Sequence, residues 1–181
     1  MSETVDRLLD AAEIAMRSRG YHGVSFRELA DDVGIKSASV HYYFPQKVDL
    51  AVALVARYSK TFFAGLDKNA GDASSSQLLR TYCSAYRSAL ELSERACLCG
   101  MFGAESCGLP KPVADAVAAF FEANMVWIGR TLPKDIAPRT RRIRSAQILA
   151  ALQGGLMIAA TLKDHGLFDG VVKRVLADNA P

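Results

Sequence analysis

The segment 25–50 constrains the fold of this chain most, because two short helical patterns are separated there by a single glycine. The first pattern begins at Ser25, which can cap a helix while Glu28, three residues later, completes a capping box. Apolar residues recur at helical spacing up to Val33 and predict one buried face. Gly34 follows where the end of a helix commonly requires a left-handed backbone conformation. We therefore expect two helices joined by a tight turn.

The second helix is predicted at about residues 37–43, with Ser37 as its N-cap. Val40 and Phe44 lie four residues apart and are expected to face the core. The opposite side carries small and polar side chains, which would allow the helix to approach base edges in the major groove of DNA. Nearby basic and hydroxyl groups suit phosphate oxygens. The candidate DNA-binding residues are Arg27, Lys36, Ser37, Ala38, Ser39, His41, Tyr43 and Lys47.

Over residues 1–50 these features resemble the TetR family of transcriptional regulators. The family pattern combines an amphipathic first helix, a glycine in the helix-turn-helix, an aromatic run and a Phe-Pro-x-Lys-x-x-Leu motif that opens a long linking helix. The chain matches it at Leu8, Leu9, Ala12, Ala15, Met16, Gly20-Tyr21, Gly34, Tyr42-Tyr43-Phe44-Pro45, Lys47, Asp49 and Leu50. The resemblance places residues 37–43 on the recognition helix, Arg27 on the preceding helix and Lys47 at a phosphate.

Two positions depart from the family pattern. His41 stands where a tyrosine is commoner. Gln46 precedes the lysine where serine or asparagine often stands, so we expect a weaker cap on the linking helix.

The resemblance also implies an architecture and a function. It implies an all-α fold, with a three-helix DNA-binding domain at residues 1–46 and a helical effector-binding and dimerisation domain at residues 47–181. It implies a ligand-responsive regulator, most often a repressor, that binds a pseudo-palindromic double-stranded DNA operator as a homodimer and is released by a small-molecule effector. A two-fold dimer suits such an operator because its recognition helices reach half-sites about one helical turn apart.

The charge of residues 1–50 is not that of a basic domain. The whole chain has a net charge of +3, but this segment contains six basic and eight acidic side chains, whereas nucleic-acid-binding domains are commonly basic. The acids gather in the first helix and at Asp31-Asp32, while basic groups flank the predicted recognition helix. A local patch, doubled in a dimer, would then supply the phosphate contacts.

The rest of the chain has helical periodicity and no alternating strand pattern. Further helices are predicted at residues 47–67, about 75–94, beyond the break at 109–112, about 139–164 and 167–178. The penultimate helix is almost free of charge after its first turns, and its residues Ala151, Gly155 and Ala159 would allow another helix to approach closely. The resemblance implies that the last two helices of each subunit form a four-helix bundle in the dimer. Two ordinary core helices of a monomer are the alternative.

The middle helices contain the candidates for the effector pocket that the resemblance implies. They combine aromatic and apolar surface with few charges, which would suit a flat or apolar effector, although such side chains are commonly core residues. The candidates are Tyr82, Cys83, Tyr86, Met101, Phe102, Phe121, Met125 and Trp127. A basic run at residues 139–144 could meet an anionic effector, but a solvated helix face is the commoner outcome.

The cysteines raise an alternative in which an oxidant or electrophile controls the regulator. Cys97, Cys99 and Cys107 are close in sequence, and Arg95 could favour a thiolate there. The Cys-Leu-Cys spacing does not fit a zinc site, so no metal is expected. Buried cysteines that act as small hydrophobic residues are the competing interpretation.

Other classes of function lack their sequence signatures. The chain has no phosphate-binding glycine loop, no paired His and carboxylate motif and no nucleophile elbow, so we expect neither catalysis nor a cofactor. The N-terminus does not resemble a signal peptide, and no apolar run approaches the roughly twenty residues of a membrane span, so we expect a cytoplasmic protein with no membrane partner. A helical ligand-binding or interaction scaffold without DNA binding remains the second alternative.

Overall fold

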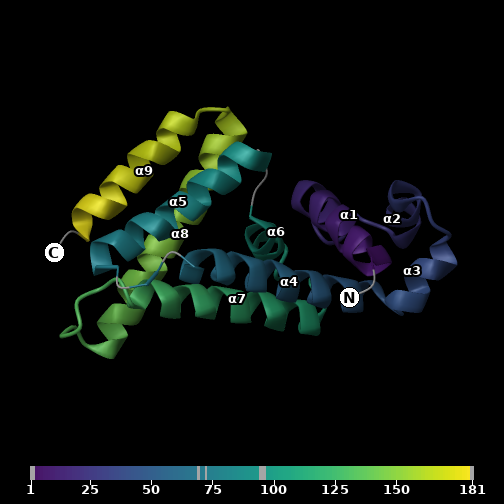
Figure 1. Cartoon of the computed structure of the whole chain (residues 1–181), viewed down its shortest axis with the longest axis horizontal. Coiled ribbons are helices and arrows are strands. Elements are labelled where there is room, and N and C mark those ends of the chain that lie inside the picture. Colours follow the sequence, from purple (N-terminus) through teal and green to yellow (C-terminus); the bar gives the residue numbers. More distant parts are fainter. Residues whose placement is uncertain (1–2, 69, 72, 94–96, 180–181) are drawn as a thin grey trace. The chain divides into compact units, whose positions relative to one another are not determined.

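The structure is a computed structural model that describes residues 3–68, 70–71, 73–93 and 97–179. Every regular element in these ranges is a helix, which confirms the predicted all-α fold (Figure 1). The helices are α1 (Glu3–Arg19), α2 (Phe26–Val33), α3 (Ser37–Tyr43), α4 (Lys47–Lys68), α5 (Ser75–Ser93), α6 (Leu98–Ala104), α7 (Lys111–Gly129), α8 (Pro138–Leu162) and α9 (His165–Asp178).

Local sequence explains where the helices of the segment 25–50 begin and end. The Ser25 hydroxyl accepts a hydrogen bond from the Glu28 backbone N–H (3.3 Å), and the Glu28 carboxylate accepts one from the Ser25 N–H (2.8 Å). Gly34 ends α2 with a φ of 73°. The predicted capping box and glycine turn are thus confirmed. The predicted cap at Ser37 is wrong, because Lys36 is the N-cap of α3 and contributes no side-chain cap, while Ser37 is already the first residue of the helix.

The chain divides into two compact units. The first combines Met1–Lys60 with Cys97–Phe120, and the second combines Thr61–Ala96 with Phe121–Pro181. In the first unit α2 packs against both α1 and α3, and α6 packs against α1. This structural division differs from the predicted functional boundary after residue 46, because the first part of α4 contributes buried residues such as Leu50 and Leu54 to the first core. That functional boundary remains a prediction.

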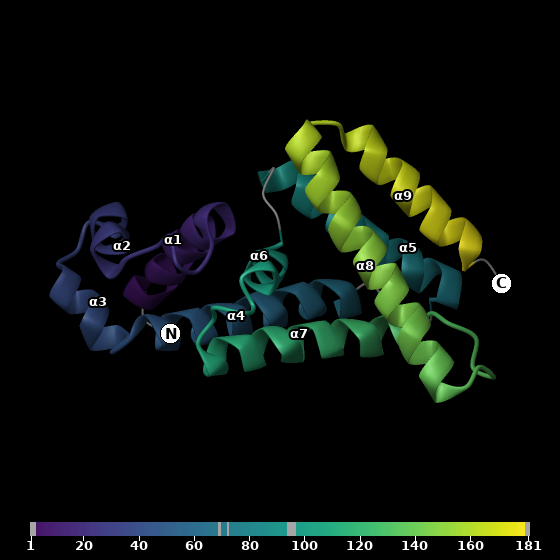
Figure 2. The same cartoon turned by 180° about the vertical axis from the view of Figure 1, so that it is seen from behind.

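In the second unit α8 and α9 run side by side, and both pack against α5 (Figure 2). Gly155 and Ala159 of α8 are buried. A Cβ atom at Gly155 would lie 3.1 Å from Cγ2 of Val171, which is tighter than ordinary packing. Ala151, by contrast, is exposed beside a groove that Val171 and Val175 also line. The close approach expected at these small residues therefore occurs at α9 of the same chain, and Gly155 and Ala159 are covered without a second subunit.

The contact at Gly155 makes a direct prediction about stability. Gly155→Val is expected to lower the free energy of unfolding by about 1–3 kcal/mol, because the added methyl groups would overlap the Val171 side chain. Gly65→Val is the matched control, since no atom lies within 4 Å of a Cβ added at Gly65 in α4. Thermal unfolding followed by circular dichroism should separate the two variants. Equal transition temperatures would show that α9 can shift to make room for the larger side chain at little cost in free energy.

By length and composition alone, α8 is apolar enough to cross a membrane. The expectation that no segment of the chain reaches this threshold is therefore wrong. The finding is weak evidence for a membrane span, because the core helix of a soluble protein meets the same criterion. The apolar residues of α8 have a role within the second unit, where Ile148, Leu149, Leu152 and Leu156 are buried.

Candidate nucleic-acid interface

Five of the eight residues predicted to contact DNA lie on α3 and away from its buried side. Val40 is fully buried and Phe44 is 7% exposed, so the opposite face of the helix is held against the first core. Lys36, Ser37, Ala38 and His41 are exposed, and Ser39 and Tyr43 are half-buried. The structure thus brings the candidate reading residues to one surface with short side chains at its centre.

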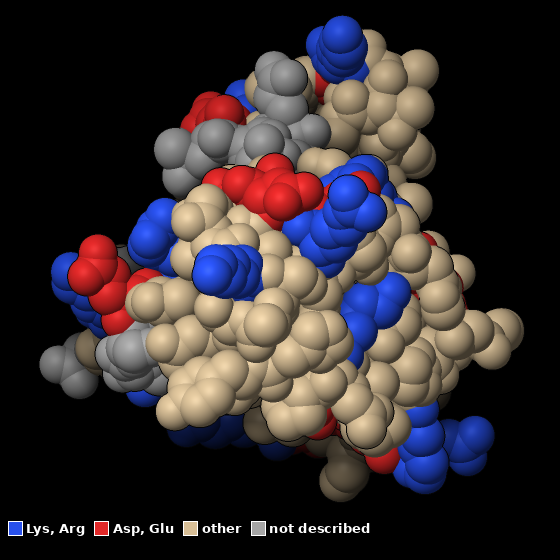
Figure 3. Space-filling view, turned by 90° about the vertical axis from the view of Figure 1, so that its right-hand side faces the viewer, with Lys and Arg blue, Asp and Glu red and all other residues tan. Residues whose placement is uncertain are grey.

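Basic side chains lie beside this surface. Arg27 on α2 and Lys36 before α3 are exposed, and neither pairs with a carboxylate among the described residues. Arg19, in contrast, pairs with Glu28 at 2.8 Å. Figure 3 views the molecule from the end at which α2 and α3 lie in Figure 1, and it shows a broad area without charged side chains that is bordered by Lys and Arg groups and also by Asp and Glu groups. Such an arrangement suits base contacts at the centre and phosphate contacts at the margin.

Tyr42 is a reading candidate that the sequence analysis missed. Its side chain is 81% exposed, the largest exposure among the large hydrophobic side chains reported as exposed, and its ring meets that of Tyr43 edge-on with centroids 5.1 Å apart. The signal was available in the sequence, because Tyr42 lies two residues after Val40 and therefore points away from the buried side of a helix. An exposed ring with a hydroxyl group at this position can reach a sugar or a phosphate.

Lys47 is bound within the first unit rather than extended into solvent. Its ammonium group donates hydrogen bonds to the carbonyl oxygens of Tyr21 and Val24, both at 3.1 Å, and lies 4.4 Å from the centre of the Tyr21 ring. Lys47 thereby ties the start of α4 to the loop between α1 and α2. An ammonium group has three donors, so one N–H is left over for a phosphate oxygen.

The same loop is also tied to the end of α6. The Tyr21 N–H donates to the Glu105 carboxylate (2.8 Å), and the rings of Tyr21 and Phe102 meet edge-on at 6.1 Å. Gly20 has a φ of 73°, and a Cβ atom there would overlap Glu105. The contact between Tyr21 and Glu105 joins residues 84 positions apart and was not predicted from the sequence. The reading helices are therefore held from two sides, by Lys47 and by Glu105.

The start of α4 is capped by a group that the sequence analysis did not assign. The Gln46 backbone N–H donates to the Asp49 carboxylate at 2.9 Å. This is one half of a capping box, with aspartate in the place of glutamate. The side chain of Asp49 thus contributes to the cap that was expected to be weak at Gln46.

The capping box predicts a pH dependence for the first unit. Hydrogen bonds from Ser25, followed by the pairing with Arg19, lower the pKa of Glu28 from 4.5 to about 2. Because the carboxylate is favoured in the folded state, its contribution to stability is complete above pH 4.5 and is lost as the pH falls through about 2. Glu28→Gln keeps a cap but cannot titrate, so urea unfolding of this variant should depend less on pH between 4.5 and 2. Identical pH profiles for both proteins would contradict this role.

Four aromatic rings gather in the second unit around the predicted effector residues. Tyr82 stacks on Trp127 with centroids 5.4 Å apart, and Phe62 meets both Tyr82 and Tyr86 edge-on at about 6 Å. The Tyr82 hydroxyl donates to the buried Asn124 side chain (2.5 Å).

One polar group beside these rings is left without a partner. Gln153 donates to the Tyr86 hydroxyl at 3.0 Å. Its buried Oε1 has no hydrogen-bond partner among the described residues. A hydrogen-bond donor that reached Oε1 would complete this arrangement.

The other predicted effector residues are dispersed. Phe102 is fully buried in the first unit, and Met101 on the same helix is half-buried. Phe121 is half-buried in α7, and Met125 lines a separate pocket toward the start of α8. The structure therefore groups Tyr82, Tyr86 and Trp127, whereas Met101 and Phe102 belong to the first unit and Met125 lines a separate pocket.

Two of the four cysteines, Cys83 and Cys99, lie in environments that disfavour the thiolate. Burial raises the pKa of Cys83 to about 11 and also raises that of Cys99. Cys97 is buried and accepts a hydrogen bond from the Tyr58 hydroxyl at 3.4 Å, whereas Cys107 is exposed. Arg95, the expected neighbouring cation, lies outside the described residues. No cluster of three or more His, Cys, Asp or Glu side chains suited to a metal ion occurs in the described part of the chain.

Known proteins support the DNA-reading interpretation of the first helices. Residues 8–54 match the model of the bacterial regulatory proteins of the tetR family. A TetR transcriptional regulator from Legionella pneumophila is 28% identical and superposes with a TM-score of 0.89, covering 97% of this chain and 96% of that one. TetR-family regulators from Agrobacterium tumefaciens (22% identical, TM-score 0.88) and Rhodobacter sphaeroides (18%, 0.86) also each cover 97% of this chain and at least 96% of their own lengths. Comparison with curated proteins gives no match.

Proposed function

Since this chain belongs to the TetR family of regulators, with a helix-turn-helix at its N-terminus, we propose that it is a cytoplasmic, ligand-responsive repressor without catalytic activity. It binds a pseudo-palindromic operator as a homodimer and leaves it when a small molecule binds. The observation that carries this proposal is the outer face of α3, where short polar side chains are exposed and the neighbouring basic residues Arg27 and Lys36 are exposed as well.

The reading face divides into two kinds of contact. Ser37, Ala38, Ser39 and His41 face the base edges, because short side chains let the helix enter the major groove. Arg27, Lys36, Tyr42, Tyr43 and Lys47 face the backbone, where hydroxyl and cationic donors meet phosphate oxygens. Substitutions in the first set change sequence preference, whereas substitutions in the second weaken binding to all sequences.

Lys47→Ala should weaken binding to all duplexes and reduce the slope of affinity against salt by about 1 for each subunit. It should also destabilise the first unit, because Tyr21 and Val24 lose the donor to their carbonyl oxygens. Fluorescence anisotropy at several salt concentrations, on protein shown by circular dichroism to be folded, measures the first effect. An unchanged salt slope would assign Lys47 to loop support alone.

Dimerisation uses the exposed stripe of α8. Ile143, Ile158 and Leu162 are each at least half exposed, and they lie on one side of the helix with Ala151 and Gly154. A second copy of this stripe, with α9 beside it, would bury these residues in a four-helix bundle. The two reading faces are then related by a two-fold axis, as a pseudo-palindromic operator requires.

The effector binds at the ring cluster of Phe62, Tyr82, Tyr86 and Trp127. The cluster suits a flat, apolar molecule that donates a hydrogen bond to Oε1 of Gln153. Its signal travels along α4, which runs from Lys47 at the loop of the reading helices to Phe62 in the cluster and beyond. The protein leaves its operator if the effector binds more tightly to the conformation that fits DNA less well.

Selection from a library of random duplexes, followed by sequencing, tests the proposed function. Purified protein should enrich one pseudo-palindrome, and a Ser39→Ala variant should enrich a changed sequence. Absence of any enrichment at low salt would favour the scaffold without DNA binding. Thiol sensing has less support than control by a reversible ligand, because two of the three candidate cysteines, Cys97 and Cys99, are buried and burial raises the pKa of Cys99.

A further inference from the structure

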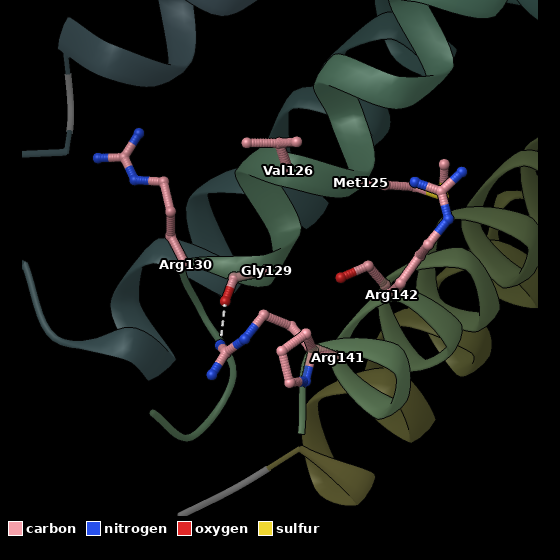
Figure 4. Close-up of a pocket in the computed structure, with 8 residues that line it drawn as sticks. Met125, Val126, Gly129, Arg130, Arg141 and Arg142 are labelled. Atoms are coloured by element: carbon pink, nitrogen blue, oxygen red, sulfur yellow. Dashed lines mark hydrogen bonds between the residues drawn. The ribbon is translucent and has the colours of Figure 1, made fainter. Parts of the chain in front are cut away.

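A pocket of about 450 Å³ lies between the end of α7 and the first turns of α8 (Figure 4). All of its lining residues belong to the second unit, and its volume is within the range of small-molecule sites. It is separate from the ring cluster, because neither Tyr82, Tyr86 nor Trp127 lines it. Its lining includes Met125, Val126 and Gly129 from α7 and Arg141, Arg142 and Ser145 from α8.

Ser145 supplies an unsatisfied hydroxyl to this pocket. The residue is fully buried, and its Oγ has no hydrogen-bond partner among the described residues. A serine within a helix ordinarily bonds to a carbonyl of the preceding turn, so the free hydroxyl is unusual. Gly129 lies directly beside it, since a Cβ atom added there would be in van der Waals contact with Oγ at 3.7 Å and with the Arg141 side chain at 3.4 Å. A ligand acceptor in the pocket would give this hydroxyl its missing bond.

The charge around the pocket is positive. Arg130, Arg141 and Arg142 line it, and no acidic side chain does. Arg142 is neutralised by Glu122 and Arg130 by Asp67. The guanidinium group of Arg141 instead donates to backbone carbonyl oxygens, including that of Gly129 at 2.7 Å, and pairs with no carboxylate in the described part of the chain. Arg141 therefore has no acidic partner, and only the N–H groups that do not bond to these carbonyl oxygens can donate to an anion.

The remaining wall is apolar. Met125 is half-buried and Val126 is 71% exposed, and Pro138 faces them from the start of α8. Figure 4 shows Arg141 next to Gly129, and Met125 and Val126 on the neighbouring helix α7. The site thus combines a hydroxyl donor and an uncompensated cation with a hydrophobic surface.

We propose that this pocket binds a small monocarboxylate with an apolar body. The carboxylate accepts a hydrogen bond from Ser145 Oγ and lies near the Arg141 guanidinium, while the apolar part covers Met125, Val126 and Pro138. The inference does not depend on DNA binding, because it concerns binding of the acid to the free protein.

Isothermal titration of the full-length protein with octanoate tests the proposal, with octanol and octylamine as matched ligands. One octanoate should bind per chain, more tightly than either control. Ser145→Ala should weaken octanoate binding about tenfold, because a hydrogen bond to a charged group is lost. Thr140→Ala, an exposed position on α8 outside the lining, should leave binding unchanged.

Stability separates a ligand role of Ser145 from a structural one. The ligand-free Ser145→Ala protein should unfold at the same temperature as the parent or higher, since an unsatisfied buried hydroxyl is removed. Three results would overturn the proposal: no octanoate binding, equal binding of octanoate and octanol, or equal octanoate affinity in parent and Ser145→Ala. Conversion of a dimer to monomers by Val126→Lys, measured by sedimentation, would also overturn it, because a second copy would then cover the pocket mouth.

Discussion

Ile158→Glu is expected to convert the dimer into monomers and to abolish high-affinity operator binding. Ile158 is 55% exposed in the isolated chain, and it lies on the α8 stripe that we assign to the subunit interface. Burying an unpaired carboxylate there would cost about 3 kcal/mol or more, which corresponds to at least about a hundredfold in the dimer dissociation constant. Sedimentation velocity measures the association, and anisotropy with the selected operator measures its consequence.

Ala64→Glu provides the matched control for this charge. Ala64 is exposed on α4, so the same substitution there leaves an ionised group in solvent and should change neither measurement. If Ile158→Glu remains dimeric at the concentrations at which the parent is dimeric, the two subunits associate through another surface. If the variant is monomeric but binds the operator as tightly as the parent, the helix-turn-helix of one subunit is sufficient for binding.

The second large effect is expected for Ala38→Glu. The carboxylate would stand at the centre of the exposed α3 face and meet the negative potential of the duplex, and like charges at an interface cost several kcal/mol. Affinity for any duplex should therefore fall by about a hundredfold or more. Gel-shift titrations of the selected operator and of an unrelated duplex would measure both losses.

Unfolding is a poor explanation for such a loss. Position 38 is in the first turn of α3, where an acidic side chain interacts favourably with the helix dipole. The variant should therefore keep the parent's unfolding temperature and its dimeric state, as should Ala64→Glu. Parent-like operator affinity of Ala38→Glu would place the DNA contact on a different surface and remove the basis of the proposed function.

The helix boundaries were largely predictable, because they depend on neighbours in sequence. The capping box of Ser25 and Glu28 and the left-handed Gly34 act over three or four residues, so their residue types are sufficient to identify them. The predicted limits of the second helix, residues 37–43, also agree with α3. Ser37 was misassigned because the Lys36 backbone itself adopts the extended N-cap conformation.

The reading face was predictable for a similar reason. The spacing of Val40 and Phe44 sets which side of α3 is buried, and the remaining positions are exposed by default. The role of those positions in DNA binding was predicted from their small and polar side chains and from the family resemblance. Tyr42 was omitted from the DNA-binding candidates, although the same periodicity places its side chain on the exposed face of α3.

The sequence by itself determined the all-α class, the two short helices around Gly34 and the exposed side of the second, because caps and helical periodicity are local properties. Only the tertiary structure decided which distant groups meet: Glu105 with the Tyr21 loop, Gly155 with Val171, and Arg141 with the Gly129 carbonyl oxygen. These contacts depend on how whole helices pack against one another. The spacing of residues along the chain does not show which side chain of another helix a given residue will contact.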